Sequence, residues 1–336
     1  MNVLFVTDEK FAEICAVAMR SITEFDEGVC FYVILDNVSD TIKNKIKRSI
    51  GEKKCEIKFI TAEHVQNRFD INIESGIWPL TCLQRLFLCD YLPKELNKVL
   101  YLDCDIIARN SLKELYEIEF DKEEYCAAVP DCVSDICRNN IGIDNRSNYY
   151  NSGVVLINLE LWRKENVAEK FMTIMYENEG KLQYPDQDII KIAFKNKIKT
   201  LNAKYNVTSY EYAYTYDELM FYHNASFYID KNEFELAINN PNIIHFTNEM
   251  LLTRPWINRT NHPYFAEWFA IREKTAWCGE KLWKNNEKLT TRIKCFFSRK
   301  LPKNLVLLFA KYLNRWHSFS YSKNKLWSVF ALRWHK

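Results

Sequence analysis

The hydrophobic pattern of the first hundred residues alternates between short apolar runs and longer segments with helical spacing. The short runs predict buried strands at residues 2–6, 30–35, 56–60 and 99–102. The segments between them predict amphipathic helices at residues 9–24, 40–50 and 81–91. Strands that alternate with helices are typical of a mostly parallel sheet covered on both faces, so the pattern predicts an α/β fold.

The rest of the chain is less regular. It predicts further strands at residues 126–129, 154–158 and 243–246, and further helices at residues 160–178 and 187–195. The tyrosine-rich stretch at residues 205–228 is expected to form loops. Because the composition changes near residue 280, we expect a main domain at residues 1–280 and a helix-compatible extension at residues 281–336.

Charge is distributed unevenly along the chain. All 44 Asp and Glu residues precede residue 288, whereas residues 288–336 contain twelve Lys or Arg and ten aromatic side chains. Such a segment suits attachment to an anionic membrane surface, with an ordinary packed extension as the alternative. Nothing in the sequence resembles a nucleic-acid recognition module. No apolar run approaches the roughly 18 residues of a membrane-spanning helix.

The cysteines and the N-terminal residues bear on the cellular compartment. Eleven cysteines are scattered without Cys-x-x-Cys pairs, and the first apolar run meets Asp8 after a few residues. Reduced thiols in a cytosol suit this pattern, and a secretory signal peptide would need a longer apolar stretch. We therefore expect a cytoplasmic protein, held peripherally on the inner face of the membrane.

The strongest chemical signal follows the strand expected at residues 99–102, where Asp103 and Asp105 are separated by one residue. If the chain leaves the strand at Asp103, both carboxylates can converge on one hard divalent cation. Such a cation could also hold a diphosphate and neutralise it as it leaves. An Asp-x-Asp triplet is common in solvated turns, but its place at the end of an apolar strand favours a chemical role.

Two further segments place polar side chains beside predicted elements. Asn151 and Gly153 precede the strand at residues 154–158, where an amide could bond a sugar hydroxyl and a glycine permits close approach to a ligand. A simple turn is the alternative. Asp186 and Gln187 open a helix near the mouth of a possible sugar pocket, although acidic residues also cap helix N-termini.

His245 and Arg254 lie at and after the last predicted strand. A histidine there is commonly a core residue, but beside two carboxylates it would suit Mn²⁺, which accepts mixed imidazole and carboxylate ligands. Arg254 could bind a diphosphate through its planar guanidinium group.

Together these segments resemble glycosyltransferase family 8, which contains bacterial lipopolysaccharide glucosyl- and galactosyltransferases and glycogenin. The resemblance spans residues 2–257 and depends on the order of several motifs. They are Thr7-Asp8, Leu-Tyr-Leu-Asp-x-Asp, Tyr-Asn-Ser-Gly-Val, Asp-Gln-Asp, and the closing His-Phe and Pro-Trp. The resemblance implies a GT-A fold and retaining transfer of glucose or galactose from a UDP-sugar. The implied acceptor is a saccharide or glycolipid, such as lipopolysaccharide core or another bacterial surface glycan.

The resemblance also implies roles for individual residues. The metal, Mn²⁺ or Mg²⁺, would be bound by Asp103, Asp105 and His245. Asp8 would read the uracil ring, Asp103 would also lie near the ribose, and Gln187 would lie close to the anomeric carbon. The implied catalytic residues are Asp186, Gln187 and Asp188. The implied donor-binding residues are Thr7, Asp8, Arg85, Asp103, Cys104, Asn151, Asp186 and Arg254.

The sequence departs from the family pattern after His245. Asn248 stands where a family glycine is usual, the following loop is longer, and Arg254 replaces a lysine. Arginine keeps the positive charge but not the geometry of a lysine.

Two other functions are compatible with parts of the sequence. An Asp-x-Asp triplet at a strand end also suits a metal-dependent phosphohydrolase, but the Gly-Thr expected after Asp105 is missing. A non-catalytic nucleotide-sugar-binding or membrane scaffold protein is the second alternative. The full set of polar residues in the four motifs favours an enzyme over a scaffold.

Overall fold

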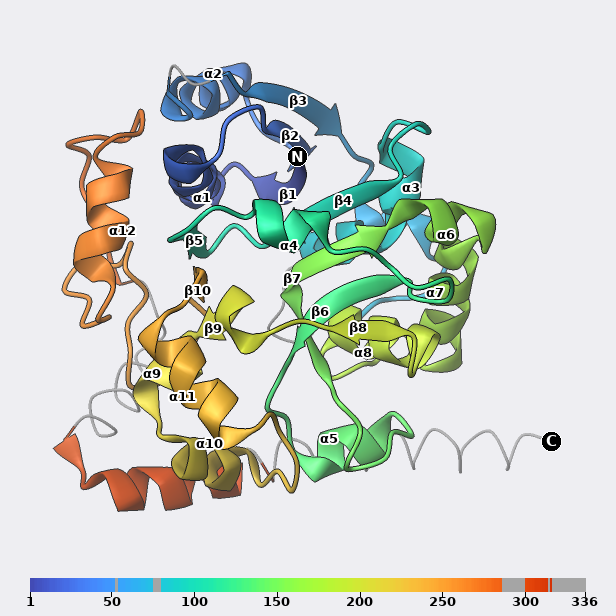
Figure 1. Ribbon diagram of the computed structural model, residues 1–336, viewed down its shortest axis with the longest axis vertical. Coiled ribbons are helices and arrows are strands. Elements are labelled where there is room, and N and C mark those ends of the chain that lie inside the picture. The colour runs from blue at the N-terminus through green and yellow to red at the C-terminus, as the bar shows by residue number, and fades with distance from the viewer. Residues whose placement is uncertain (52–53, 75–79, 286–299, 314, 316–336) are drawn as a thin grey trace.

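The computed structural model describes residues 1–51, 54–74, 80–285, 300–313 and 315. At its centre lies a seven-stranded sheet with the order β3-β2-β1-β4-β7-β6-β8 (Figure 1). Its strands are β1 (Asn2–Asp8), β2 (Cys30–Asp36), β3 (Glu56–Thr61), β4 (Lys98–Leu102), β6 (Cys126–Pro130), β7 (Tyr150–Asn158) and β8 (Ile198–Thr200).

The central sheet is mostly parallel, as the sequence pattern predicts. Strand β1 pairs in parallel with β2 and β4, β2 with β3, and β6 with β8. Strand β7 runs antiparallel to both of its neighbours, β4 and β6. The carboxyl ends of β1 and β4 therefore meet the start of β7 at one edge of the sheet, where ligands of open α/β sheets bind.

Helices cover both faces of the sheet. The α-helices are α1 (Ala12–Phe25), α2 (Asp40–Ser49), α3 (Leu88–Tyr91), α4 (Lys113–Glu117), α5 (Asp135–Asn140), α6 (Leu159–Lys164), α7 (Val167–Glu177), α8 (Pro185–Phe194), α9 (Ser209–Ala213), α10 (Tyr216–His223), α11 (Lys231–Asn239) and α12 (Phe265–Arg272). The 3-10 helices are η1 (Val65–Arg68), η2 (Leu80–Phe87) and η3 (Ala203–Tyr205).

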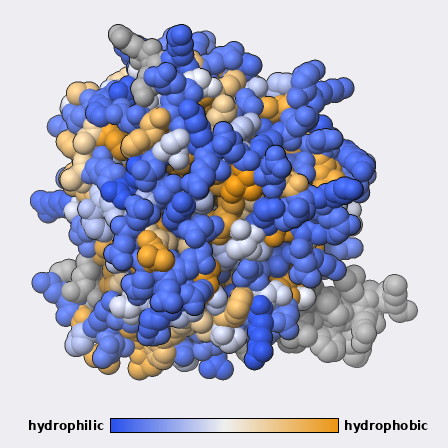
Figure 2. All heavy atoms as spheres, viewed as in Figure 1, coloured by the Kyte–Doolittle hydropathy of each residue, from blue (hydrophilic) through white to orange (hydrophobic). Residues whose placement is uncertain are grey.

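The core has two parts because side chains alternate between the two faces of each strand. Val3 and Phe5 of β1 face a cluster that includes α1 and α12. Leu4 faces the opposite cluster, built on η2, α6, α7 and α8. The space-filling view shows mostly hydrophilic residues on the outside, with hydrophobic residues exposed between them (Figure 2).

A second, three-stranded sheet has the order β5-β10-β9. Its strands are β5 (Ile106–Ala108), β10 (Ile243–His245) and β9 (Val207–Thr208). Strand β10 pairs antiparallel with β5, so that His245 lies opposite Ile106. This register brings the end of β10 next to the chain that leaves β4, although the two segments are far apart in the sequence.

Three of the predicted elements differ in the structure. The helix expected at residues 160–178 is two helices, α6 and α7, because Asn166 adopts a left-handed conformation with φ of 46°. The helix expected at residues 81–91 is the 3-10 helix η2 followed by the short helix α3. Strand β7 begins at Tyr150, so Asn151 and Gly153 lie within the strand rather than before it.

The prediction of loops at residues 205–228 was wrong, because this stretch contains the helices α9 and α10. Each begins with a capping box. The side chain of a threonine accepts a hydrogen bond from a backbone N–H of the first turn, and the side chain of a glutamate three residues later accepts one from the backbone N–H of that threonine. The pairs are Thr208 with Glu211 and Thr215 with Glu218. A Thr-x-x-Glu signature is visible in the sequence and predicts a helix start.

Part of the basic C-terminal segment is described, and residues 303–313 are helical. Val306, Leu307 and Ala310 are buried, and Lys303 forms an ion pair of 2.6 Å with Glu218 of α10. The expected extension spans residues 281–336, and its residues 286–299, 314 and 316–336 lie outside the described residues. Within the described part of the chain, the helices are too short or too polar to span a bilayer.

Candidate functional site

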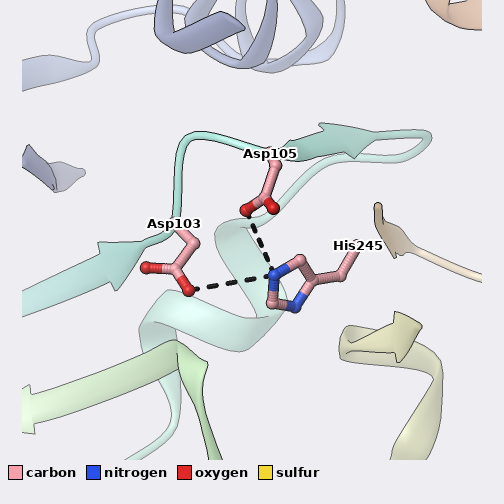
Figure 3. A group of neighbouring side chains, drawn as sticks. All are labelled: Asp103, Asp105 and His245. Carbon is pink, nitrogen blue, oxygen red and sulfur yellow. Dashed lines mark ion pairs between the residues drawn. The ribbon is translucent and has the colours of Figure 1, made fainter. Parts of the chain in front are cut away.

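Asp103, Asp105 and His245 point toward one another at the edge of the central sheet (Figure 3). Asp103 follows β4, Asp105 precedes β5, and His245 ends β10. Nε2 of His245 lies 3.2 Å from Oδ1 of Asp105 and 3.8 Å from Oδ2 of Asp103. One ligand atom from each residue lies within 4.8 Å of the others. The structure thus brings together the three residues expected to bind a metal, Asp103, Asp105 and His245, which together form the metal group.

This group has the donor atoms and the charge that a divalent cation needs. Two carboxylates and an imidazole suit Mn²⁺, whereas Mg²⁺ favours oxygen ligands. Burial lowers the pKa of His245, but Asp105 and Asp103 outweigh that effect and raise it above its usual value. Burial opposes ionisation of Asp105, yet His245 and Arg254 hold its pKa below the usual value. The raised pKa of His245 reflects the negative charge of the two carboxylates, which a cation would neutralise.

Arg85 lies between two of the predicted site carboxylates. Its Nη2 is 2.7 Å from Oδ1 of Asp103, and its Nη1 is 3.1 Å from Oδ2 of Asp186. Nη1 also donates to the carbonyl oxygen of Ser152 at 2.8 Å, and the guanidinium group covers the ring of Tyr101. Arg85 is almost fully buried. Its guanidinium group therefore ties the metal group to the start of α8.

Asn151 and Gln187 meet beside Asp131, which sequence reasoning did not select. Nδ2 of Asn151 donates to Oδ2 of Asp131 and to Oε1 of Gln187, each at 3.2 Å. Nε2 of Gln187 donates to the same oxygen of Asp131 at 3.3 Å. The sequence signal for Asp131 is its position directly after a strand, at the edge where the other carboxylates lie.

The two acidic residues that flank Gln187 face different surroundings. Asp186 accepts a hydrogen bond from the hydroxyl of Ser152 and lies beside Arg85. Asp188 accepts from the hydroxyl of Tyr149 at 2.6 Å and from the backbone N–H of Tyr184 at 3.0 Å. Asp188 is only 2% exposed, and burial raises its pKa to about 6. Both of its carboxylate oxygens thus bond to protein groups.

Thr7, Asp8 and Cys104 lie at the carboxyl ends of β1 and β4, which are parallel neighbours. The carboxylate of Asp8 accepts from the backbone N–H of Phe11 at 2.7 Å, at the start of α1. The hydroxyl of Thr7 donates to the carbonyl oxygen of Asp8 at 3.1 Å. The thiol of Cys104 donates to the carbonyl oxygen of Val6, also at 3.1 Å.

Arg254 reaches the metal group from the loop after β10. Its Nη2 lies 3.6 Å from Oδ2 of Asp105, and its Nε donates to the carbonyl oxygen of Phe246 at 3.1 Å. The guanidinium carbon is 5.4 Å from the ring centre of Trp256. The longer loop therefore still brings a positive charge to this site.

Asn206 is a second site residue that sequence reasoning did not select. It is buried, directly precedes β9, and contacts both His245 and Asn151 through its side chain. Its contact with His245 depends on the pairing of β9 with β10, which the sequence alone does not reveal.

Two lipopolysaccharide glycosyltransferases are similar to this chain in sequence. Lipopolysaccharide 1,2-glucosyltransferase of Escherichia coli is 30% identical over 269 residues, which cover 78% of this chain and 74% of that protein. Lipopolysaccharide 1,3-galactosyltransferase of Salmonella typhimurium is 24% identical over 215 residues, which cover 61% of this chain and 63% of that protein.

Among solved structures, the galactosyltransferase LgtC in complex with donor and acceptor sugar analogues superimposes with a TM-score of 0.67 and 22% identity. The match covers 87% of this chain and 99% of that one, which confirms the predicted GT-A fold. The model of glycosyl transferase family 8 matches residues 2–260. Because this match covers most of the sequence, the chain belongs to glycosyl transferase family 8.

Proposed function

We propose that this protein is a retaining, metal-dependent glycosyltransferase that moves glucose or galactose from a UDP-sugar to a saccharide acceptor. The observation that carries the proposal is the convergence of Asp103, Asp105 and His245 beside the polar groups of Asn151 and Gln187. A cation site next to groups that can bond sugar hydroxyls suits a nucleotide-diphosphate sugar. The names of the relatives favour lipopolysaccharide core or another bacterial surface glycan as the acceptor.

In this proposal Asp103, Asp105 and His245 hold Mn²⁺ or Mg²⁺. The bound cation would neutralise the charge that develops on the UDP leaving group. The guanidinium group of Arg254 lies close to the carboxylate of Asp105 and adds a positive charge beside the proposed cation site. Arg85 bonds to Asp103 and Asp186, and so holds the carboxylates that meet the donor.

The donor would be bound along the sheet edge, from β1 to the start of α8. Asp8, next to Thr7 and Cys104, reads the uracil ring at the end of β1. Asn151 and Asp186 bond the sugar hydroxyls. Gln187 lies beside the anomeric carbon, and the acceptor hydroxyl attacks from the face that UDP leaves.

Asp188 has a supporting position in this arrangement. It follows Gln187 in α8 and is buried, and the hydroxyl of Tyr149 donates to one of its oxygens. Its negative charge would stabilise the oxocarbenium-like state from a distance, while its hydrogen bonds fix the first turn of α8. The leaving phosphate would accept the proton of the acceptor hydroxyl.

We further propose that the extension at residues 281–336 attaches the enzyme to the anionic inner face of the membrane, where a glycolipid acceptor would lie. The helix at residues 303–313 exposes Leu305, Leu308, Phe309 and Tyr312, each more than half accessible. The described basic residues of this region include Lys300, Lys303, Lys311 and Arg315. Apolar side chains beside basic ones suit an interface with anionic lipid.

Calorimetric binding of UDP-glucose, UDP-galactose and UDP-N-acetylglucosamine, each with and without Mn²⁺, tests the proposed function. We expect one donor to bind in a metal-dependent way, and the folded Asp105→Ala variant to lose both that binding and metal-dependent turnover. If the folded wild-type protein binds none of the three donors, the enzyme proposal fails and a scaffold role takes its place. Full activity of a folded Asp105→Ala variant would overturn the metal assignment.

A further inference from the structure

A chain of side-chain amides connects the metal group with the residues proposed to face the sugar. It begins at the backbone N–H of Gly153, which donates to Oδ1 of Asn151 at 2.9 Å. A backbone N–H can only donate, so this bond fixes which end of the Asn151 amide is the acceptor. Nδ2 of Asn151 then faces Asp131 and Gln187, as their oxygens require.

The orientation of Asn151 in turn fixes that of Asn206. Oδ1 of Asn151 also accepts from Nδ2 of Asn206 at 2.8 Å. Because the NH₂ group of Asn206 must face this oxygen, its Oδ1 faces the opposite way, toward His245. That oxygen lies 2.9 Å from Nδ1 of His245. An amide oxygen only accepts, so Nδ1 of His245 must be the nitrogen that carries a proton.

This proton placement matters for metal binding. In a neutral imidazole with the proton on Nδ1, Nε2 keeps a free electron pair. Nε2 is the atom that lies closest to Asp105 and Asp103. The amide chain therefore selects the tautomer of His245 that can ligate a cation held by the two carboxylates.

We propose that Asn206 is a positioning residue that holds His245 in its metal-binding tautomer and orientation. The proposal rests on the proposed function, because it presumes that His245 binds a divalent cation. Histidines that bind metals commonly donate their other ring N–H to a fixed acceptor, and loss of that acceptor weakens metal binding. Through Asn151, the same amide also links the cation site to Gln187.

The fold gives Asn206 little freedom to do anything else. It is only 3% exposed, so water cannot readily replace its side chain. Its backbone N–H donates to the carbonyl oxygen of Ala203 at 3.0 Å. The next two residues form β9, in which Thr208 pairs with His245 itself. The sheet that carries His245 therefore also fixes the residue that orients it.

The test uses MnCl₂ alone, without nucleotide sugar, and follows free Mn²⁺ by electron paramagnetic resonance. Asn206→Ala removes the acceptor for Nδ1 of His245, and we expect Mn²⁺ affinity to fall by about 10–100-fold. Asn206→Asp keeps an oxygen acceptor for Nδ1, so we expect Mn²⁺ binding at least as tight as in the wild type. The Asp variant lacks the NH₂ group that faces Asn151, and its KM for the donor should rise.

Asn242→Ala is the matched control. Asn242 is also buried and directly precedes β10, but its side chain meets Asn110 rather than His245. Removal of this amide should leave Mn²⁺ affinity unchanged. Electron spin-echo modulation from a directly bound ¹⁴N reports ligation by His245 itself. We expect this signal in the wild type and in Asn206→Asp, and a weaker one in Asn206→Ala.

Unchanged Mn²⁺ affinity in a folded Asn206→Ala variant would overturn the proposal, as would equal losses in Asn206→Ala and Asn242→Ala. If Asn206→Ala does not fold, Asn206→Asp decides: retention of the ¹⁴N signal supports the proposal, and its loss overturns it. A wild-type protein that binds no Mn²⁺ is a different result. It would remove the metal from the proposed function, and the role of Asn206 would fall with it.

Discussion

Gly153 lies against the imidazole ring of His245. A Cβ atom at residue 153 would stand 2.3 Å from Cε1 of His245 and 2.9 Å from Oδ2 of Asp103. Both separations are far shorter than ordinary van der Waals contact. The main chain of β7 can therefore approach the metal group only because residue 153 has no side chain.

Gly153→Ala is expected to displace His245 or Asp103 and weaken Mn²⁺ binding at least tenfold. Overpacking at this position should also lower the free energy of unfolding by about 1–3 kcal/mol. Mn²⁺ titration and urea denaturation measure the two effects. Val154→Ala is the control, since Val154 is buried on the same strand. It should destabilise the fold without changing Mn²⁺ affinity, and a similar loss of affinity in both variants would contradict the prediction.

The metal group could be predicted from the sequence because each member ends or follows an apolar run. Asp103, Asp105 and His245 are recognisable without knowing which strands pair. The contacts of Asn206 with His245 and of Asp131 with Asn151 were not predictable, because they join segments far apart in the chain, although the position of Asp131 after a strand was visible in the sequence. Gly153 was expected to make room for a ligand, whereas the structure shows that it makes room for the protein's own side chains.

The fold was predictable to a similar extent. The alternation of strands and helices predicts the sheet, because hydrophobic periodicity reports burial directly. The break between α6 and α7 follows from a single left-handed residue, Asn166, which periodicity does not reveal. The helices α9 and α10 were not predicted, because their aromatic residues do not follow the spacing of an amphipathic helix. Their capping pairs were the better signal.

Arg85 provides positive charge next to Asp103, and this leads to a prediction about metal rescue. Arg85→Met takes the guanidinium group away from Asp103 and Asp186 in a largely buried site, and we expect the free energy of unfolding to fall by about 3–5 kcal/mol. Mn²⁺ should restore part of that stability, because the cation supplies charge beside Asp103.

Urea denaturation with and without Mn²⁺ measures this rescue. Arg68→Met is the matched control, because Arg68 forms an ion pair of 2.6 Å with Asp90 away from the metal group. Stabilisation by Mn²⁺ should exceed the wild-type value in Arg85→Met alone. An equal effect of Mn²⁺ on the two variants would contradict the prediction.

The buried carboxyl of Asp188 should make stability depend on pH. Burial raises its pKa to about 6 from a usual value of 3.8. A carboxyl with a raised pKa stabilises the folded state fully below its unfolded pKa, and this contribution is lost as pH rises through the folded pKa. The loss amounts to at most about 3 kcal/mol.

Asp188→Asn cannot ionise and isolates this effect. Relative to the variant, the wild-type free energy of unfolding should fall between about pH 4 and pH 7, by no more than that amount. Urea denaturation at a series of pH values measures the difference. Tyr149→Phe removes a hydrogen bond that lowers the pKa of Asp188. In that variant the pH range over which stability is lost should therefore shift to higher pH. A difference that does not change with pH would contradict the prediction.

The helix at residues 303–313 allows a test of membrane attachment by its apolar side chains. Leu305 and Phe309 are 53% and 61% exposed, and lipid would bury both. We expect the full chain to sediment with vesicles that contain anionic lipid, and high salt to release it because the basic residues are screened.

A double substitution tests whether the exposed apolar side chains take part. Leu305→Ser with Phe309→Ser should weaken vesicle binding at least about tenfold, because each substitution removes apolar surface that lipid would bury. Leu236→Ser is the control, because Leu236 is also exposed, at 70%, but belongs to α11 rather than to the helix at residues 303–313. Salt-insensitive binding, or equal binding by the double variant and the control, would count against attachment through this helix.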